Sequence, residues 1–476
     1  MGATIARADV PAGFYGVNVQ QVFDGSSSSW APDLSAMAGG GLSLARIDAR
    51  WENVEPNPPS GGTHTYNWSM YDGIVQGLAQ HGLRWLPIVD YSTSWSGVNP
   101  GQDTSAVAPA YVPDFAAYAA ALARRYGPGG SFWTSHPSLT PMPVTEFEIW
   151  NEENSTVFWQ PQAGNAEAYA DLYLAARNAI KGVNSQARVY IGGLALANPP
   201  AVSDEVDFIK RMYAHRPDLA GNVDGVGLHP YQANVYDTYM RLARFRQALN
   251  SVAGASVPIE VTEVGWSSST VSESQRAADL TQLAEELPRS DCNVDRFLPY
   301  TWITEESNQN DPEQWFGIWN RDGSPKPSGQ AYLNAVELMR GMTSTPAPSA
   351  PVAICSVDYD PAPPAPPPVT PHPPPVKPPR GPRLILRVRR HHRTTLVVAG
   401  QCHAGCKLSV SLLATKKPAR ESRVTMRQTH FSSRRQLVHL RLSKRFLERA
   451  RHARVVVVAI GRNGARTTAS RRLKLH

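Results

Sequence analysis

The sequence predicts an α/β protein in which a (β/α)8 barrel is followed by a proline-rich linker and a small all-β sandwich. Three observations support this division. Eight short apolar runs alternate with helical segments, a proline tract interrupts the chain, and the hydrophobic period then shortens to two residues. We therefore expect a barrel at 1–345, a linker at 346–382 and an immunoglobulin-like sandwich at 383–476.

The barrel strands are expected where apolar and β-branched residues form short runs between turn residues. Helical periodicity fills several of the intervals, clearly at 114–125 and 165–183 and less regularly at 72–80 and 272–287. An open doubly wound sheet is the competing fold, but the sequence lacks the glycine-rich phosphate turn that usually follows its first strand. The eight expected strands are 14–19, 42–47, 84–90, 145–150, 188–193, 225–229, 258–264 and 296–302.

The linker is expected from proline content, with the segment PAPPAPPP at 361–368 as its centre. Proline has no backbone N–H to donate, so such a tract adopts extended polyproline II and acts as a semi-rigid spacer. A ligand for an SH3-type domain is the functional alternative.

The segment after the linker combines strand-like patterns with a strong positive charge. Short runs at 384–389, 407–412, 436–442 and 455–460 predict its strands. Residues 381–476 hold 24 Lys and Arg against two acidic residues, whereas the preceding part holds 23 basic and 38 acidic residues. No nucleic-acid-binding motif accompanies this charge, so we expect an anionic cell-surface polymer as partner and no specific nucleic acid. An appendage without a partner remains the alternative.

Cysteine placement bears on the compartment and on metal binding. Cys402 and Cys406 bracket a short loop, and Cys292 and Cys355 remain as a possible long-range pair. Zinc-ligand spacing is absent, so we expect no metal and no cofactor. Disulfides favour a secreted or cell-surface protein, although the N-terminus lacks a signal-peptide pattern and leaves a cytoplasmic protein open. No apolar run is long enough to predict a transmembrane segment.

Two glutamates follow predicted strands at the face of the barrel where active sites lie. Glu152 comes after the fourth strand, and Glu263 ends the seventh. Cleavage of a glycosidic bond needs two flanking carboxyl groups, one to protonate the leaving oxygen and one to attack the sugar or activate water. Asn151 and Glu152 would point to opposite faces of a regular strand, so we expect the strand to end or bulge there.

The motifs around these glutamates resemble those of clan A glycoside hydrolases, in which an Asn-Glu pair ends strand four and a second Glu ends strand seven. The matching segments are IWNE at 149–152 and TEVGW at 262–266. Arg46 on the second strand, HPY at 229–231 and Trp302 on the eighth strand add to the match. The resemblance covers roughly residues 12–340 and is closest to families 39 and 5, which include xylosidases and cellulases.

This resemblance implies a retaining O-glycoside hydrolase that acts by double displacement on a polysaccharide or oligosaccharide. It assigns Glu152 as the acid/base and Glu263 as the nucleophile, with carboxyl groups roughly 5–5.5 Å apart. Arg46 would keep the nucleophile ionised. A transglycosylase shares all these residues, and a catalytically silent carbohydrate-binding barrel is the other alternative.

The resemblance also implies roles for four further residues. Asn151 would bind the sugar 2-hydroxyl, His229 and Tyr231 would orient the nucleophile, and Trp302 would form a stacking floor for the sugar ring.

For other residues, the expected role follows from their position in the expected loops and strand ends and not from the resemblance. Trp95 and Trp159 lie in loops at the catalytic face and suit outer sugar subsites. Asp48, Asp90 and Glu260 are expected as supporting or salt-bridge partners.

Overall fold

The computed structural model divides the chain into two compact units, Met1–Asp360 and Pro361–His476, and each is considered separately. Most of the expected linker, from 358 to 382, lies outside the described residues. The structure describes residues 10–11, 13–24, 27–99, 105–160, 165–195, 202–357, 384–392, 395–402, 407–416, 420–428, 436–441, 452–460 and 466–474.

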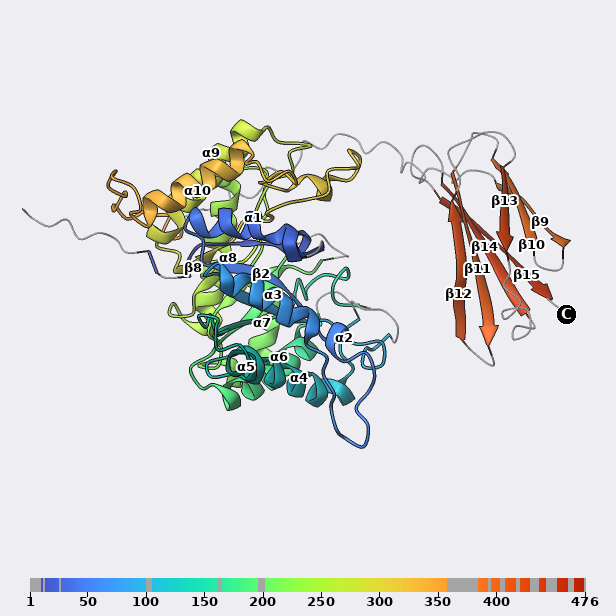
Figure 1. Ribbon diagram of the computed structural model, residues 1–476, viewed down its shortest axis with the longest axis horizontal. Helices are drawn as coiled ribbons and strands as arrows, with labels where there is room; N and C mark the ends of the chain where they lie inside the picture. Colours follow the sequence, from blue (N-terminus) through green and yellow to red (C-terminus); the bar gives the residue numbers. More distant parts are fainter. Residues whose placement is uncertain are drawn as a thin grey trace, which may run out of the picture. The chain divides into compact units, whose positions relative to one another are not determined.

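The first unit is a (β/α)8 barrel, as predicted (Figure 1). Its eight strands are parallel neighbours in sequence order, and Tyr15 bridges Phe297 in parallel to bring the last strand back to the first. The strands are β1 (Gly16–Asn18), β2 (Leu44–Arg50), β3 (Arg84–Asp90), β4 (Glu146–Asn151), β5 (Arg188–Leu194), β6 (Val226–Leu228), β7 (Ile259–Val261) and β8 (Val294–Phe297).

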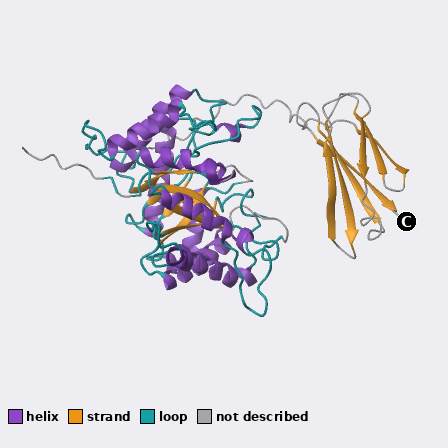
Figure 2. Cartoon of the chain, in the orientation of Figure 1, coloured by secondary structure: helices purple, strands orange, loops and turns teal. Residues whose placement is uncertain are grey.

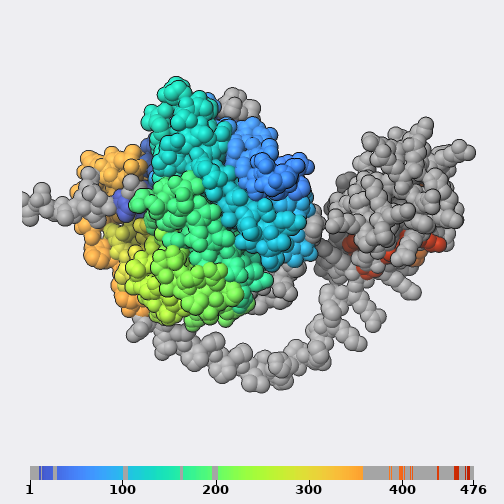
Figure 3. Space-filling model, turned by 90° about the horizontal axis from the view of Figure 1, so that it is seen from below, coloured from blue at the N-terminus to red at the C-terminus, as the bar shows by residue number. Residues whose placement is uncertain are grey.

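Helices surround this sheet (Figure 2). The last helix packs beside the beginning of the unit, where the Tyr332 hydroxyl donates to the Gly16 carbonyl at 2.8 Å, so the two ends of the unit adjoin (Figure 3). None of the helices in the described part of the chain is long and apolar enough to span a membrane. The helices are α1 (Ser27–Gly39), α2 (Trp51–Val54), α3 (Ser69–Gln80), α4 (Val112–Tyr126), α5 (Ser131–Ser135), α6 (Ala166–Val183), α7 (Glu205–His215), α8 (Val235–Ala253), α9 (Glu273–Glu286) and α10 (Pro327–Met339).

Strands β7 and β8 are shorter than the sequence predicts. β8 was expected to reach residue 302 but ends at Phe297. Beyond it the backbone bonds to two different neighbours, because Leu298 N donates to Val261 O at 2.9 Å and Trp302 N to Asn18 O at 2.9 Å. Residues after β7 and β8 therefore occupy irregular backbone at the carboxyl end of the barrel, where they can face a site.

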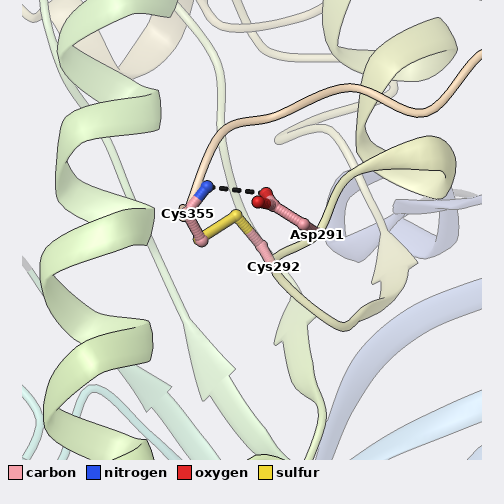
Figure 4. Close-up of side chains that lie close together, drawn as sticks. All are labelled: Asp291, Cys292 and Cys355. Carbon is pink, nitrogen blue, oxygen red and sulfur yellow. Dashed lines mark hydrogen bonds between the residues drawn. A yellow bond between two sulfur atoms is a disulfide. The ribbon is translucent and has the colours of Figure 1, made fainter. Parts of the chain in front are cut away.

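The segment that closes the first unit is fixed to the barrel by a disulfide and a carboxylate (Figure 4). Cys292 and Cys355 are bonded, as one of the two expected pairs. Asp291 accepts backbone hydrogen bonds from Ile354, Cys355 and Ser356 at 2.7–2.9 Å. Burial raises the pKa of Asp291, but hydrogen bonding to the Ser356 side chain and to these three backbone groups outweighs it and lowers the pKa to about 2. The beginning of the expected linker, up to Ser356, is thus held against the barrel.

The second unit consists of two antiparallel sheets, in agreement with the predicted β domain; its immunoglobulin-like character stays a prediction. The sheet orders are β13-β10-β9 and β12-β11-β14-β15. Along β14, Val455 and Val457 are buried whereas Val456 is half-buried, the period of two expected for a sheet with one inner face. The strands are β9 (Leu384–His392), β10 (Thr395–Cys402), β11 (Lys407–Lys416), β12 (Arg420–Gln428), β13 (Gln436–Arg441), β14 (His452–Ile460) and β15 (Arg466–Lys474).

Cys402 in β10 is buried and disulfide-bonded. Its expected partner, Cys406, lies outside the described residues.

Candidate active site

A cavity of about 690 Å³ opens at the carboxyl ends of the barrel strands. Glu152 and Glu263 both line it, although 111 residues separate them in sequence. The cavity therefore gathers the two carboxyl groups that the sequence singled out. Its lining residues are Gln20, Asp48, Tyr91, Asn151, Glu152, Val157, Phe158, Tyr231, Glu263, Tyr300, Glu313 and Phe316.

Glu263 is held between a cation and a phenol. One carboxylate oxygen accepts from the Arg46 guanidinium at 2.6 Å, and the other accepts from the Tyr231 hydroxyl at 2.9 Å. Burial raises the pKa of Glu263, but the charges of His229 and Arg46 and the two hydrogen bonds prevail, so its pKa lies below the ordinary value. An ionised carboxylate at the edge of a cavity is the state that a nucleophile needs.

Arg46 organises the base of the site from β2. Its guanidinium is fully buried and donates to both oxygens of Glu148 in β4, at 2.6 and 3.1 Å. It also donates to the side-chain oxygens of Asn18 at 2.8 Å and Asn151 at 2.9 Å. One planar cation from β2 thus fixes side chains of β1 and β4 together with Glu263.

The backbone turns sharply where Asn151 and Glu152 leave β4. Trp150 and Glu152 have positive φ angles of 73° and 49°, and the Glu152 N–H donates to the Gly193 carbonyl at 3.1 Å. Both Asn151 and Glu152 consequently face the cavity. The expectation that the strand ends or bulges here is confirmed, and left-handed backbone at a non-glycine residue is a conformation that proteins retain mainly at functional sites.

His229 contacts both glutamates. Its Nδ1 lies 2.9 Å from a Glu152 oxygen, at hydrogen-bond distance, and 3.7 Å from a Glu263 oxygen. The prediction that His229 orients the nucleophile stays a prediction. Tyr231 does contact Glu263, as predicted.

The two carboxyl groups are close together. One oxygen of Glu152, one oxygen of Glu263 and a nitrogen of His229 all lie within 4.8 Å of one another. These three side chains are also the one group at the cavity that could bring three metal-ligand atoms together among the described residues. A second group, Asp291 with Cys292 and Cys355, contains two sulfurs that are bonded to each other.

Two tryptophans predicted to bind substrate lie outside the cavity lining. Trp302 is fully buried, donates from its indole to Asp33 at 2.8 Å and stacks on Trp319, so it cannot form a floor for a sugar ring. Trp95 packs edge-on against Trp51 and donates to the Glu55 carbonyl at 3.3 Å.

Trp159, the other tryptophan suggested for an outer subsite, is buried against Trp150. Trp159 and Trp302 therefore serve packing, whereas Trp95 is partly exposed and its role as an outer subsite stays a prediction.

The aromatic lining comes instead from residues that the sequence reasoning missed. Tyr91 follows β3, Phe158 lies in the loop after β4, and Tyr300 and Phe316 lie in the loops after β8. Position directly after a strand was a usable signal for Tyr91. The other three depend on how long loops fold back, which periodicity does not encode.

The expected supporting acids have three different environments. Glu260 pairs with Arg296 at 3.0 Å and Arg188 at 3.2 Å, as expected of a salt-bridge partner. Asp48 lines the cavity. Asp90 is fully buried, neither of its oxygens has a hydrogen-bond partner among the described residues, and burial followed by the charge of Asp48 raises its pKa well above the ordinary value.

Solved structures that share this fold are glycoside hydrolases. A family 39 glycoside hydrolase from Bacteroides cellulosilyticus WH2 matches 90% of this chain and 78% of its own, with 17% identity and a TM-score of 0.52. A family 5 enzyme from Streptomyces cattleya, in complex with Manβ1-4GlcNAc, matches 71% of this chain and 83% of its own, with 16% identity and a TM-score of 0.50.

A family 39 β-xylosidase from Caulobacter crescentus matches 86% of this chain and 84% of its own, with 19% identity and a TM-score of 0.49. No protein-family model and no curated protein sequence matches the chain. The structural neighbours thus come from families 39 and 5, which the motifs indicated, and at these identities the likeness establishes the fold.

Proposed function

We propose that this protein is a retaining O-glycoside hydrolase in which Glu152 is the acid/base and Glu263 the nucleophile. The observation that carries the proposal is the pairing of these two carboxyl groups in one cavity, with oxygens within 4.8 Å of each other. Inverting enzymes need room for a water molecule and separate their carboxyl groups by roughly 6.5–9.5 Å, whereas retaining enzymes keep them at roughly 5–5.5 Å. One oxygen of each group within 4.8 Å of the other is compatible with the retaining arrangement and with double displacement.

The surroundings of each glutamate suit its proposed role. A Glu263 oxygen attacks the anomeric carbon while Glu152 gives its proton to the departing oxygen, and a covalent glycosyl ester forms. Glu152 then removes a proton from water as the water oxygen attacks the same carbon and releases Glu263. Arg46 and Tyr231 hold Glu263 in place, and Asn151 is positioned by Arg46 to bind the sugar hydroxyl next to the reacting carbon.

The lining of the cavity favours a neutral substrate over an acidic one. Asp48, Glu152, Glu263 and Glu313 contribute carboxyl groups, and no lysine, arginine or histidine is among the described residues that line the cavity. A uronic acid ring would meet like charges without a cation to pair with. The four aromatic side chains offer faces for the C–H surfaces of sugar rings.

The direct test is release of reducing sugar from a panel of neutral and acidic polysaccharides and aryl glycosides, with Glu263→Gln and Glu152→Gln in parallel. We expect activity on a neutral class that both substitutions abolish. Activity that survives Glu263→Gln would overturn the assignment of the nucleophile. Binding of a glycan without any turnover would favour the alternative of a catalytically silent barrel.

A transglycosylase remains the second candidate, because it would use the same residues. What would separate the two activities is the relative access of water and of a sugar acceptor to the glycosyl intermediate. Products longer than the substrate, seen by mass spectrometry of the digest, would identify transfer to a sugar acceptor rather than to water.

We further propose that the basic second unit binds an anionic cell-surface polymer and that the protein acts outside the cytoplasm. The 24 basic and two acidic residues at 381–476 support the first statement, and the disulfides support the second. Removal of residues 381–476 should abolish retention on acidic cell-wall material at low salt. Unchanged retention would contradict the proposal.

A further inference from the structure

A chain of hydrogen bonds runs from Glu152 into the interior of the barrel. His229 Nδ1 lies 2.9 Å from Glu152 Oε1, and His229 Nε2 lies 3.2 Å from the Thr262 hydroxyl. The Thr262 hydroxyl lies 3.0 Å from Glu148 Oε1, and Glu148 is paired with Arg46. Every side chain between Glu152 and Arg46 in this chain is fully buried.

The chain determines where one proton of His229 lies. Glu148, whose two oxygens face the Arg46 guanidinium, acts as a carboxylate and can only accept hydrogen bonds. The Thr262 hydroxyl therefore donates to Glu148, and its oxygen accepts from His229. Consequently Nε2 of His229 carries a hydrogen atom, and Nδ1 is the nitrogen that faces Glu152.

A second proton must lie between His229 Nδ1 and Glu152. At 2.9 Å, a lone pair on Nδ1 and a bare carboxylate oxygen would repel, so one proton joins them, either on the imidazole or on the carboxyl group. Glu263, 3.7 Å from the same nitrogen, favours positive charge there. The charge of His229 is in turn the largest of the influences that lower the pKa of Glu263 against the effect of burial.

The barrel is built to hold the imidazole in this position. A Cβ atom at Gly193 in β5 would lie 1.9 Å from His229 Nε2, so only glycine leaves room for the ring. The same residue accepts the Glu152 N–H through its carbonyl, and it thereby fixes both members of the pair.

We infer that His229 is a positioning residue that shares the catalytic proton with Glu152, and that Thr262 and Glu148 fix the tautomer which makes this possible. The inference rests on the proposed glycosidase function. When Glu152 protonates the leaving oxygen, the pair gives up its one shared proton, and the Nδ1 lone pair of neutral His229 then faces the Glu152 carboxylate. This repulsive arrangement makes the pair ready to take a proton back in the next step. When water attacks the glycosyl ester, its proton returns to the pair and its oxygen becomes the sugar hydroxyl.

The first experiment compares wild type with His229→Gln on aryl glycosides that differ only in the leaving group. The substitution should lower kcat/KM about 100-fold for a poor leaving group but only a few-fold for dinitrophenolate, which needs no acid. The alkaline limb of the pH–rate profile should move to lower pH by roughly one to two units, the interval between ordinary imidazole and carboxyl groups. An equal loss for both leaving groups with an unmoved alkaline limb would overturn the inference.

The groups that face His229 determine which control variants are informative. They are Glu152 after β4, Glu263 and Thr262 after β7, and Glu148 behind Thr262. Thr262→Val removes the acceptor that fixes the tautomer, and its alkaline limb should move in the same direction as that of His229→Gln. Thr262→Ser keeps the hydroxyl, and its alkaline limb should coincide with that of wild type.

The tautomer of His229 can also be measured directly, without any activity assay, by ¹⁵N NMR spectroscopy. In a ¹⁵N-histidine-labelled wild-type protein, the imidazole nitrogens of His229, assigned by comparison with His229→Gln, should show Nε2 protonated across the pH range of the folded state. Only Nδ1 should titrate. A neutral form with its proton on Nδ1 would overturn the inference even if the enzyme is active, whereas a wild type inactive on every glycoside would overturn the proposed function instead.

Discussion

Two buried arginines lie inside the same barrel, one near each end. Arg46 lies between Glu148 and Glu263, and Arg296 lies between Glu146 at 2.9 Å and Glu260 at 3.0 Å. Both guanidinium groups are buried almost completely. The two ends of the barrel thus use the same kinds of side chains in nearly the same arrangement.

The two ends differ in the surroundings of the carboxylates that pair with each arginine. We call the end with Arg46 the open end and the end with Arg296 the closed end. Glu263 borders the cavity, so a substrate atom can reach it. Arg296 is enclosed further by the Gly13 carbonyl at 3.1 Å and the Tyr190 hydroxyl at 3.0 Å, and its guanidinium lies over the Tyr190 ring. A buried ion pair that is surrounded by protein groups on every side can only hold the structure together. A buried ion pair with one partner at a cavity can also take part in a reaction.

The largest expected effect is a difference in catalytic activity between variants at the two ends of the barrel. Glu263→Gln should reduce kcat/KM by about 10⁴-fold or more, because it removes the attacking carboxylate, while it leaves the fold intact. Glu260→Gln, the matched change at the closed end, should leave kcat/KM within a few-fold of wild type. Steady-state kinetics gives kcat/KM for both variants. Similar losses of kcat/KM in both would contradict a functional difference between the two ends.

The closed end should matter chiefly for stability. Arg296→Met leaves the buried Glu260 and the partly buried Glu146 without their main partner, and it should lower the free energy of unfolding by about 3–5 kcal/mol. Arg188→Met removes a cation that is one-third exposed from the same Glu260, and it should cost at most about 1 kcal/mol. Urea denaturation monitored by tryptophan fluorescence gives both values. Equal losses would mean that burial does not set the strength of these pairs.

The pH dependence of stability should report Glu260. Burial outweighs the charges of Arg296 and Arg188 and raises the pKa of Glu260 from 4.5 to about 7 in the folded state. Protonation therefore favours folding, and this contribution is full below pH 4.5 and is lost as the pH rises through 7. Relative to Glu260→Gln, wild type should lose up to about 3 kcal/mol between these values. Parallel stability curves in urea titrations would contradict this prediction.

A smaller effect should distinguish aromatic residues that line the cavity from those beneath it. Tyr300→Ala removes an aromatic face that lines the cavity and, if this face binds the sugar as proposed, should raise KM about tenfold. Trp302→Phe leaves Asp33 without its indole partner and should lower stability by about 1–2 kcal/mol with KM unchanged. Kinetics and thermal unfolding of both variants check the division, and the reverse pattern would restore Trp302 as a substrate residue.

Sequence patterns predicted the barrel because its strands are short apolar runs that only a parallel sheet buries on both faces. Helices α1, α7, α8 and α10 were missed. Pro32 interrupts the pattern of α1, and polar residues obscure that of α8. Glu152 and Glu263 could be found because each lies within two residues of a strand end. Trp302 could not be placed correctly, because β8 stops at Phe297 and the following backbone bonds to β1 instead.

We propose Glu263 as the nucleophile at the end of the barrel that opens into the cavity. The most direct measurement is the mass of the intact protein, followed by peptide mapping, after incubation with a 2-deoxy-2-fluoro glycosyl fluoride of the preferred sugar. We expect one added glycosyl group on the peptide that contains Glu263. A label on any other carboxyl group, or rapid turnover of natural substrate with an inverted first product and no label, would contradict it.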